Sequence, residues 1–561
     1  MKKIIILLAS VLVSVTMVFS EEIDSTKTWK AFKTDGIYNR AQLDSLGIQI
    51  ELKKYFLSEI DKNPAPIATA EQRKAGYILF IRNYLFDVFP FNKPLKEEMA
   101  KKDIKIFASL GEYEPIVFSV YPLENLTVCR IIISEFNNEK GDKLTKESFQ
   151  VNNVLAYPNE GGSMIGITNV LKRANDIPLI EKEVVKSVWI NVKIPENAKE
   201  GVYKGTVTFA PTGKPSASIP VEIRVFPYRL MQPPPEVMTW APIMAGSHDF
   251  DLEKEFTTIK ELGMTGEITD LRDLNKANKY MEIAKKVGLP GKFVDFSLHC
   301  QGTSKYESTY GPYGMGDTQF CEASYQRLTE DVRKIQENAT KNKWLPFLFY
   351  LTTECGYPGA SGPESYRKTQ QGCENYYAAA RKVEGANLMA TFNRQEELTA
   401  HWNLSTLDAF GFNGEMFPEW EKGMKQKPSW MTFIAIDQRC GHGFYMRKYD
   451  FKGVRPWKLY LDQLDGSGLM FWDKEKKEFL PVARFNRIRE GVDDYKYCYT
   501  LSELIKEAKA KGKDVSGAEK VLKTILDKIP HDHKKHTAGF DYTKMDEFRL
   551  KLAEQILKLM N

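Results

Sequence analysis

The stretch FLFYLTTE, residues 347–354, is an apolar run that ends abruptly at a carboxylate. It lies in the middle of a series of apolar runs separated by amphipathic, helix-like stretches such as 274–287. Short strands that alternate with helices predict parallel strands joined by crossover helices. In barrels of such strands the catalytic groups stand at the carboxyl ends of the strands. Glu354, directly after a central strand, is therefore the first candidate for a catalytic acid.

Working outward from this run, eight candidate strands lie between residues 236 and 499. The predicted strands are 237–243, 266–269, 292–298, 345–351, 387–392, 407–412, 432–436 and 466–471. Helical stretches at 252–262, 274–287, 321–341 and 364–383 separate several of them. Eight such repeats predict a (β/α)8 TIM barrel. The alternative is an open, doubly wound sheet, which would be favoured by a Gly-rich dinucleotide-binding turn after the first strand, and that turn is missing.

Upstream of the barrel, short apolar runs follow one another without helices between them. This pattern predicts an antiparallel β-sandwich over residues 103–232. The predicted strands are 104–108, 116–121, 126–133, 149–156, 188–194, 202–209 and 219–226. Three consecutive prolines at 233–235 mark the domain boundary, because proline cannot join a sheet ladder. The fold class is thus multidomain: an all-β sandwich and an α/β barrel.

The two ends of the chain carry further segments. Residues 21–102 have a mixed pattern that is helical at 40–60 and 70–86. A helix expected at 482–509 would cover the last strand of the barrel, and residues 500–561 predict a C-terminal helical appendage with helices at 516–528 and 545–559.

The first twenty residues predict an export signal. Lys2 and Lys3 precede the apolar run 4–19, and Ser20 offers a small residue at the cleavage position. The alternative is a membrane anchor, but the run is short for a span and is followed by Glu21 and Glu22 instead of basic residues. Cleavage after Ser20 predicts a secreted or periplasmic protein with no membrane span left in the mature chain.

Composition excludes several classes of partner. The formal net charge is +5, and Lys and Arg are spread along the chain beside Asp and Glu, so no nucleic-acid partner is indicated. The seven cysteines include no CxxC pair, so a finger-type zinc site is unsupported. We predict neither a metal ion nor an organic cofactor, and the oligomeric state stays open.

The residues at the predicted strand ends favour carbohydrate chemistry. Glycoside hydrolysis needs one carboxyl group that donates a proton and a second group that stabilises an oxocarbenium-like centre. Glu354 is the candidate for the first role and Asp437 for the second, although Asp437 could instead pair with Arg439. Aromatic and amide side chains can stack on sugars and bond to their hydroxyls. The candidate substrate contacts are Trp240, His299, Asn393, Asn413, Tyr445 and Trp472.

Four segments carry a family resemblance: ASLGEYEPIVFSVY (108–121), EGVYKGTV (200–207), WKLYLDQLDGSGLMFWD (457–473) and RFNRIREGVDDYKY (484–497). They resemble glycoside hydrolase family 123 and its relatives. The resemblance implies an N-terminal sandwich, a catalytic TIM barrel and an adjacent Asp-Glu pair after the fourth strand. In that family the Glu is the acid/base, and the Asp holds the substrate's 2-acetamido group, which attacks the anomeric carbon. Glu354 matches the Glu, while Thr353 stands at the position of the Asp and is a further candidate substrate contact.

Because Thr353 stands where the family has an Asp, the sequence leaves more than one function open. A neutral hydroxyl cannot stabilise a developing oxazolinium charge as a carboxylate can. One interpretation is a secreted glycoside hydrolase for a poly- or oligosaccharide, in which Asp437 acts as the second acid. The runner-up is a non-catalytic glycan-binding protein of the cell envelope, and a third option is an assembly protein driven by the sandwich. A carboxyl separation of about 5–5.5 Å predicts retention of configuration, and one of about 6.5–9.5 Å predicts inversion.

Overall fold

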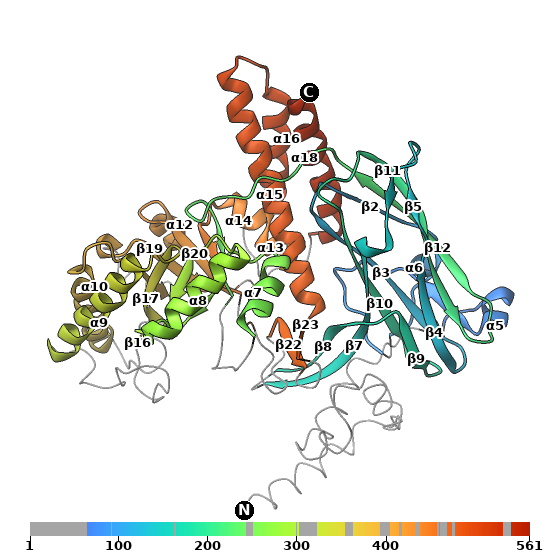
Figure 1. Ribbon diagram of the computed structural model, residues 1–561, viewed down its shortest axis with the longest axis horizontal. Coiled ribbons are helices and arrows are strands. Elements are labelled where there is room, and N and C mark those ends of the chain that lie inside the picture. The colour runs from blue at the N-terminus through green and yellow to red at the C-terminus, as the bar shows by residue number, and fades with distance from the viewer. Residues whose placement is uncertain are drawn as a thin grey trace, which may run out of the picture.

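The computed structural model has three parts: a β-sandwich, a curled parallel sheet covered by helices, and a group of long C-terminal helices (Figure 1). The structure describes residues 64–90, 92–161, 164–242, 251–298, 300–301, 322–353, 363–392, 404–413, 418–433, 438–456, 459, 468–473, 477–530 and 540–561.

The sandwich consists of two sheets that share one core. One sheet has the order β1-β3-β10-β7-β8 and the other β2-β12-β11-β4-β9, with the short β5 and β6 beside β11. Alternation along β10 explains the stacking, because Val188, Ile190 and Val192 enter the shared core while Trp189 packs on the opposite face. The bounds are β1 Tyr77–Phe80, β2 Ile104–Ala108, β3 Tyr113–Pro122, β4 Leu126–Ile133, β5 Phe136–Asn137, β6 Lys143–Leu144, β7 Phe149–Gly161, β8 Met164–Arg173, β9 Asp176–Ile180, β10 Lys186–Lys193, β11 Gly201–Pro211 and β12 Ala217–Val225.

The sandwich differs from the sequence prediction in three respects. Its predicted start at residue 103 lies too far downstream, because β1 pairs with β3 and belongs to the first sheet. The helix expected over 70–86 is only α5 (Ala70–Ala75), which ends at Gly76 with φ of 81°. Gly76 takes this left-handed conformation without the strain that a side chain would add, and β1 follows at once. The sandwich is also not wholly antiparallel, since β2 pairs with β12 in parallel.

Eight parallel strands form the second, curled sheet, in the order β13-β21-β20-β19-β18-β17-β15-β14. Hydrogen bonds also join the chain next to its two end strands: the Ile268 N–H of β14 donates to Pro242 O (3.0 Å), just after β13, and the Thr265 N–H, just before β14, donates to Trp240 O of β13 (2.9 Å). The inner side is filled by Ala241, Ile268, Val294, Leu348, Tyr350, Met389, Ala409 and Trp430. The bounds are β13 Thr239–Trp240, β14 Ile268–Thr269, β15 Phe293–Asp295, β17 Phe347–Thr353, β18 Leu388–Phe392, β19 Ala409–Asn413, β20 Ser429–Phe433 and β21 Gly453–Val454, with β16 Cys300–Gln301 beside the end of β17.

Helices cover the outer side of this sheet; four of the five lie where the sequence predicted them, and the helix at 418–424 was not predicted. They are α7 (Leu252–Glu261), α8 (Leu274–Val287), α9 (Glu322–Lys341), α10 (Pro363–Arg381) and α12 (Pro418–Met424). Local signals fix the helix starts: the Asp251 carboxylate accepts from two N–H groups of the first turn of α7, and Asp273 accepts from the Lys276 N–H in α8. Such N-caps satisfy donors that the helix itself leaves unpaired.

The predicted eighth strand is wrong. Residues 466–471 were expected to close the barrel, but β22 (Met470–Asp473) pairs antiparallel with β23 (Glu478–Pro481) in a separate ribbon. The eighth parallel strand is β21, between β20 and β13. Its sequence, FKGVRP, lacks the apolar run that marks a strand. Position 453 is a glycine instead of an apolar residue for a packing reason: a Cβ there would lie 2.3 Å from the indole ring of Trp430.

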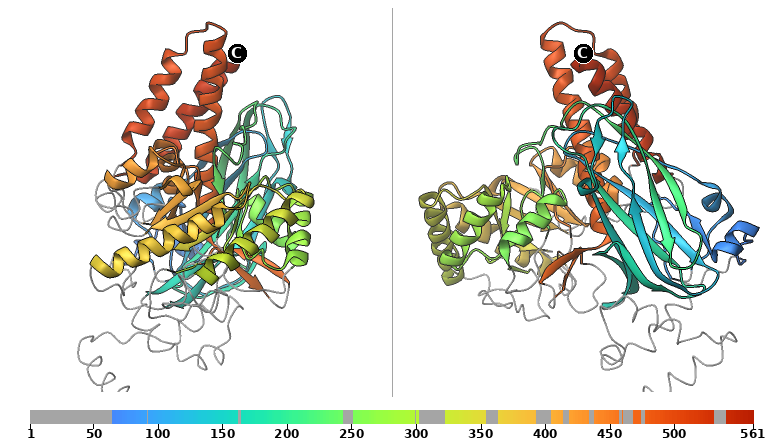
Figure 2. Two further views of the ribbon diagram at one scale, coloured as in Figure 1. Left: turned by 90° about the vertical axis from the view of Figure 1, so that its left-hand side faces the viewer. Right: turned by 45° about the vertical axis from the view of Figure 1, so that its right-hand side comes forward.

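Three long helices complete the chain as predicted: α15 (Ala483–Ala510), α16 (Ser516–Lys528) and α18 (Met545–Met560). They rise from the junction between the sandwich and the parallel sheet (Figures 1 and 2). The first half of α15 is buried almost all round, which includes charged residues such as Glu490 and Asp494.

Arg549 of α18 is the centre of a buried charge network at this junction. It is 1% exposed, and its guanidinium contacts Glu114 of β3 (2.5 Å), Glu490 (3.0 Å) and Asp494 (2.5 Å) of α15 and, more distantly, Glu112 (3.5 Å). Buried charges cost several kcal/mol each unless they are paired and hydrogen-bonded. The network therefore ties the sandwich, α15 and α18 into one unit.

Burial changes the protonation of the acids around Arg549. It raises the pKa of Glu112 to about 7, against the attraction of Arg549, and it raises the pKa values of Glu114 and Glu490. Glu112 accepts hydrogen bonds from Tyr497 Oη (2.8 Å) and from the backbone N–H of Ser109 (2.7 Å). The carboxyl groups of Glu112, Glu114 and Glu490 thus bind protons more readily than free glutamic acids do.

Replacement of Gly453 by alanine should destabilise the fold. The added methyl group must displace the Trp430 ring, and overpacking of this kind costs about 1–3 kcal/mol. The matched control is Gly517→Ala in α16, where a Cβ meets nothing within 4 Å. Denaturant titration should show a loss for Gly453→Ala and no loss for Gly517→Ala; equal midpoints would contradict the assignment of β21 as a packed strand.

The raised pKa of Glu112 predicts a pH dependence of stability. Between pH 4.5 and about 7 the folded protein keeps a proton that the unfolded chain has lost, so this group makes the free energy of unfolding fall as the pH rises through that window. Glu112→Gln removes this contribution, which is on the order of 3 kcal/mol for a rise in pKa from 4.5 to about 7. Urea titrations at pH 5 and pH 8 should show a smaller loss for the variant than for the wild type, and an equal loss would contradict the assignment.

Candidate active site

The carboxyl ends of the eight parallel strands define one face of the molecule. The short β16 pairs with Thr352 and Thr353, the last residues of β17, and so marks that end of the sheet. In Figure 1 this face lies on the lower side, where the β22–β23 ribbon and the β7–β8 hairpin also lie. Val170 of β8 forms a bridge to Val482 next to β23, so the sandwich is joined to this face.

Three buried side chains converge near the ends of their strands. Tyr350 of β17 shares a hydrogen bond with Thr391 of β18 (Oη–Oγ1 2.6 Å). The Arg455 guanidinium, directly after β21, lies 4.4 Å from the centre of the Tyr350 ring and is 1% exposed. A cation held over an aromatic face is stabilised by the ring's quadrupole. Sequence reasoning did not identify Arg455, because it placed the eighth strand at 466–471. The signal that could have identified it is its place directly after the strand residues Gly453 and Val454.

A β-bulge interrupts β17 just before its end. Tyr350 pairs with Met389 and Thr352 with Ala390, so Leu351 is an extra residue on β17. Regular alternation would place Thr352 on the inner side with Tyr350, yet its hydroxyl bonds to Tyr377 of the outer helix α10. Bulges of this kind re-aim the residues that follow and are frequent next to active sites. Strict alternation from Tyr350 therefore does not predict the face of the sheet on which Thr352 and the residues after it lie.

Four of the predicted site residues lie outside the described part of the chain, and three others are placed by their strand position alone. Glu354, Asp437, His299 and Asn393 lie outside the described residues. For Thr353, Asn413 and Trp472 the structure gives the strand position only: they are the last residue of β17, the last of β19 and the third of β22. Thr353 and Asn413 thus stand at ends of parallel strands, as expected, whereas Trp472 belongs to the antiparallel ribbon.

Trp240 and Tyr445 are core residues in this structure. Trp240 is fully buried, its indole N–H donates to His442 O (3.2 Å), and its ring packs edge-on against Tyr495. Tyr445 of α14 (Phe444–Lys448) is 1% exposed and packs against Tyr449 and Phe451. Both therefore belong to the hydrophobic core, and a direct sugar contact by either stays a prediction.

Asp295, the last residue of β15, is a buried acid at the same face. Burial raises its pKa to about 6, although the N–H groups of Leu271 (3.1 Å) and Ser297 (3.0 Å) bond to its Oδ1. A carboxyl group with a raised pKa at a strand end is suited to proton transfer. A second buried acid, Glu267, receives a hydrogen bond from Tyr280 and lies against Glu255 of α7, so burial and this neighbour raise its pKa. That pair lies between strand and helices and is structural in character.

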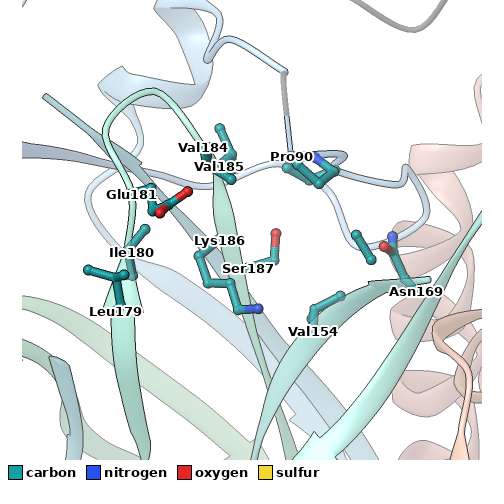
Figure 3. Close-up of a pocket in the computed structure, with 12 residues that line it drawn as sticks. Pro90, Val154, Asn169, Leu179, Ile180, Glu181, Val184, Val185, Lys186 and Ser187 are labelled. Carbon is teal, nitrogen blue, oxygen red and sulfur yellow. The ribbon is translucent and has the colours of Figure 1, made fainter. Parts of the chain in front are cut away.

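Two cavities among the described residues lie away from the strand ends. One, of about 30 Å³, is enclosed by the Val88–Pro90 segment and by β7 to β10, including Asn169, Glu181 and Ser187 (Figure 3). Its volume is enough for a water molecule and too small for a sugar ring. The other, of about 430 Å³, separates β3 from α7 and α15. Its charges pair with one another, as in Lys286–Glu253 (2.7 Å) and Lys496–Asp493 (3.1 Å).

In the described part of the chain, no three His, Cys, Asp or Glu side chains come together as metal ligands. Within the same ranges, no helix combines the length and the apolar character that a membrane crossing requires.

Known proteins are similar to this chain in sequence and in fold. The family model of the Glycoside hydrolase 123 N-terminal domain matches residues 112–210, which lie in the sandwich. A family 123 glycoside hydrolase from Clostridium perfringens, described for glycolipid glycan hydrolysis, superposes with a TM-score of 0.57 over 82% of this chain and 93% of its own, at 13% identity. At that identity the superposition shows a shared fold.

Two other solved structures are less similar. They are a GH5 xyloglucanase from Bacteroides ovatus (TM-score 0.31, 11% identity, 70% of this chain and 98% of its own) and a family 39 glycoside hydrolase from Bacteroides cellulosilyticus WH2 (TM-score 0.34, 12% identity, 70% and 82%). Scores this low carry no argument about function. No curated protein sequence matches the chain.

The family model covers the sandwich, and the shared fold extends over most of the chain. Both agree with the segments from which the family resemblance and the glycosidase class were inferred. Residues 112–210 are thus similar to the N-terminal domain of glycoside hydrolase family 123, and the chain shares its fold with an enzyme of that family.

Proposed function

We propose that this protein is an exported glycoside hydrolase that cleaves a poly- or oligosaccharide at the carboxyl-terminal face of a complete (β/α)8 barrel. The observation that carries the proposal is the end of β17, the fourth parallel strand, which stops at Thr353, one residue before Glu354. The hydrogen bonds between β13 and the chain entering β14 support closure of the barrel. In closed barrels the active site lies at this face.

Two carboxyl groups have separate roles in the proposed reaction. Glu354 donates its proton to the glycosidic oxygen as the bond to the anomeric carbon breaks, and later takes a proton from the attacking water or hydroxyl. Asp437 stabilises the positive charge at the anomeric carbon or attacks it. Arg455 lies at the same end of the sheet, and a permanent cation there favours the ionised form of a nearby carboxyl.

The substrate class follows from the family and from the departure at Thr353. The Clostridium perfringens enzyme is described for glycolipid glycans, which supports an oligosaccharide substrate. Thr353 supports a sugar that does not depend on a 2-acetamido nucleophile, because a hydroxyl offers no negative charge to an oxazolinium. The same residue favours the second candidate function, a non-catalytic glycan-binding protein of the envelope.

Replacement of Glu354 by glutamine should abolish most of the hydrolysis of aryl glycosides. Loss of a general acid/base lowers kcat by about 10²- to 10⁴-fold. The matched control is Glu384→Gln, an exposed carboxylate between α10 and β18, which should keep wild-type activity. Full activity of Glu354→Gln would remove this residue from the mechanism, and binding of glycans without turnover by the wild type would favour the second function.

Replacement of Thr353 by aspartate should recreate the carboxylate pair of the family. We expect at least a tenfold gain in kcat/KM on aryl 2-acetamido glycosides, because one preorganised electrostatic contact is worth about 10²-fold or more. Thr353→Asn is the control of similar size without the charge and should show no gain. The expectation would be contradicted if the wild type already preferred 2-acetamido glycosides and neither substitution changed its kcat/KM on them. Thr353 would then be no obstacle to catalysis on acetamido sugars.

A further inference from the structure

The larger cavity, of about 430 Å³, lies where the sandwich meets the helices of the parallel sheet. It is lined by the start of β3, the end of β10, α7, the end of α8 and α15. Pockets that hold small ligands have volumes of about 300–1,000 Å³, so this one has room for a small molecule. Crossover helices run back to the amino ends of their strands, so the last residues of α7 and α8 lie away from the candidate active site.

Arg489 of α15 lines this cavity with a donor that lacks an acceptor. The residue is 3% exposed, and its Nε has no hydrogen-bond partner within the described part of the chain. Its Nη2 donates to Asn191 Oδ1 (3.3 Å) and to Glu490 Oε1 (3.4 Å), so the guanidinium is held in place. A buried donor without an acceptor is costly, because it has lost its bond to water. An acceptor atom of a ligand in the cavity would remove that cost.

The lining offers donors and acceptors in balance. Five basic and five acidic side chains line the cavity. Some of them pair across it, as Lys286 does with Glu253 (2.7 Å). A charged ligand would be attracted by one set and repelled by the other, so it gains little from electrostatics. A hydroxyl group both donates and accepts, so a ligand rich in hydroxyls can bond to both sets.

Several of the donors are fixed before any ligand arrives. The Arg489 guanidinium lies 4.8 Å from the centre of the Tyr113 ring, and the Lys193 ammonium lies 5.1 Å from it. Contacts of this kind hold a cation at an aromatic ring. Lys260 Nζ donates to Val287 O (2.7 Å), which ties α7 to the end of α8. Groups that are already ordered lose less freedom on binding.

We propose that this cavity is an accessory binding site for an uncharged sugar unit, separate from the site of the proposed hydrolysis. Arg489, Lys193 and Lys260 donate hydrogen bonds to the sugar hydroxyls. Glu261 and Asp493, which also line the cavity, accept hydrogen bonds from them. The inference goes beyond the proposed function and does not depend on it. A second site on the same chain raises the effective concentration of a long glycan at the first.

Thr257 allows the cavity to be filled without a change to the core. It is exposed on α7 and lines the cavity, so Thr257→Trp places an indole ring in the space. Lys254→Trp is the matched control, because Lys254 is exposed on the same helix and does not line the cavity. Arg489→Lys keeps the positive charge and removes the Nε donor.

The test measures binding of methyl glycosides of glucose, galactose, mannose and N-acetylglucosamine to the full-length protein by saturation-transfer NMR, with glucuronate and sulfate as anionic probes. We expect at least one neutral glycoside to bind the wild type and Lys254→Trp equally. Thr257→Trp and Arg489→Lys should raise its Kd about tenfold or more, which corresponds to the loss of one or two hydrogen bonds. Crystals soaked in that glycoside should show its ring in the cavity, beside the Arg489 guanidinium.

Three results would overturn the proposal: equal binding by Thr257→Trp and Lys254→Trp, a soaked ring found only elsewhere, or tighter binding of glucuronate or sulfate than of every neutral glycoside. Melting temperatures show whether Arg489→Lys is folded, and if it is not, Thr257→Trp decides. The two proposals fail independently. A wild type without glycosidase activity would refute the proposed hydrolysis, and the glycoside titrations would still decide the cavity.

Discussion

The buried charge network around Asp494 is the constraint on which the assembly of this protein depends. One carboxylate is shared by two guanidinium groups, from Arg439 of α13 (Gln438–His442) and Arg549 of α18, and further acids of β3 and α15 surround Arg549. Removing one member of such a cluster leaves a buried charge unpaired, which typically costs 3–5 kcal/mol. Sandwich, parallel sheet and C-terminal helices are therefore held at fixed positions by a few charged side chains, in addition to the apolar core.

The network also connects stability with the candidate active site. Arg439 follows the seventh strand, and Val482, which bridges to the sandwich hairpin, precedes α15. Both connections lie at the face where the parallel strands end. The sandwich is thus more than an appended module, because it supports the rim of the face on which the proposed hydrolysis takes place.

Much of this architecture could be predicted from periodicity. The strands at 104–108 and 126–133 and the helices at 274–287 and 516–528 have the expected bounds, since each is a complete apolar pattern with clear ends. The eighth strand could not be predicted, because the Trp430 ring fills the space beside Gly453 where a side chain would otherwise lie. The strand therefore has a glycine at this position and no apolar run. The bulge at Leu351 is equally invisible in FLFYLTTE, since alternation alone does not record an extra residue. The glycosidase assignment came from the family segments and the strand-end acids, whereas Arg455 emerged only with the fold.

The proposed hydrolysis requires that two acids, after the fourth and seventh strands, meet across a sugar-binding cleft. The most direct test is a crystal structure of the protein with a bound sugar analogue, in which the distance between the carboxyl groups of Glu354 and Asp437 is measured. We expect a separation of about 5–5.5 Å or about 6.5–9.5 Å, with the sugar between the two groups. A much larger separation, with no third acid near the anomeric carbon, would contradict it.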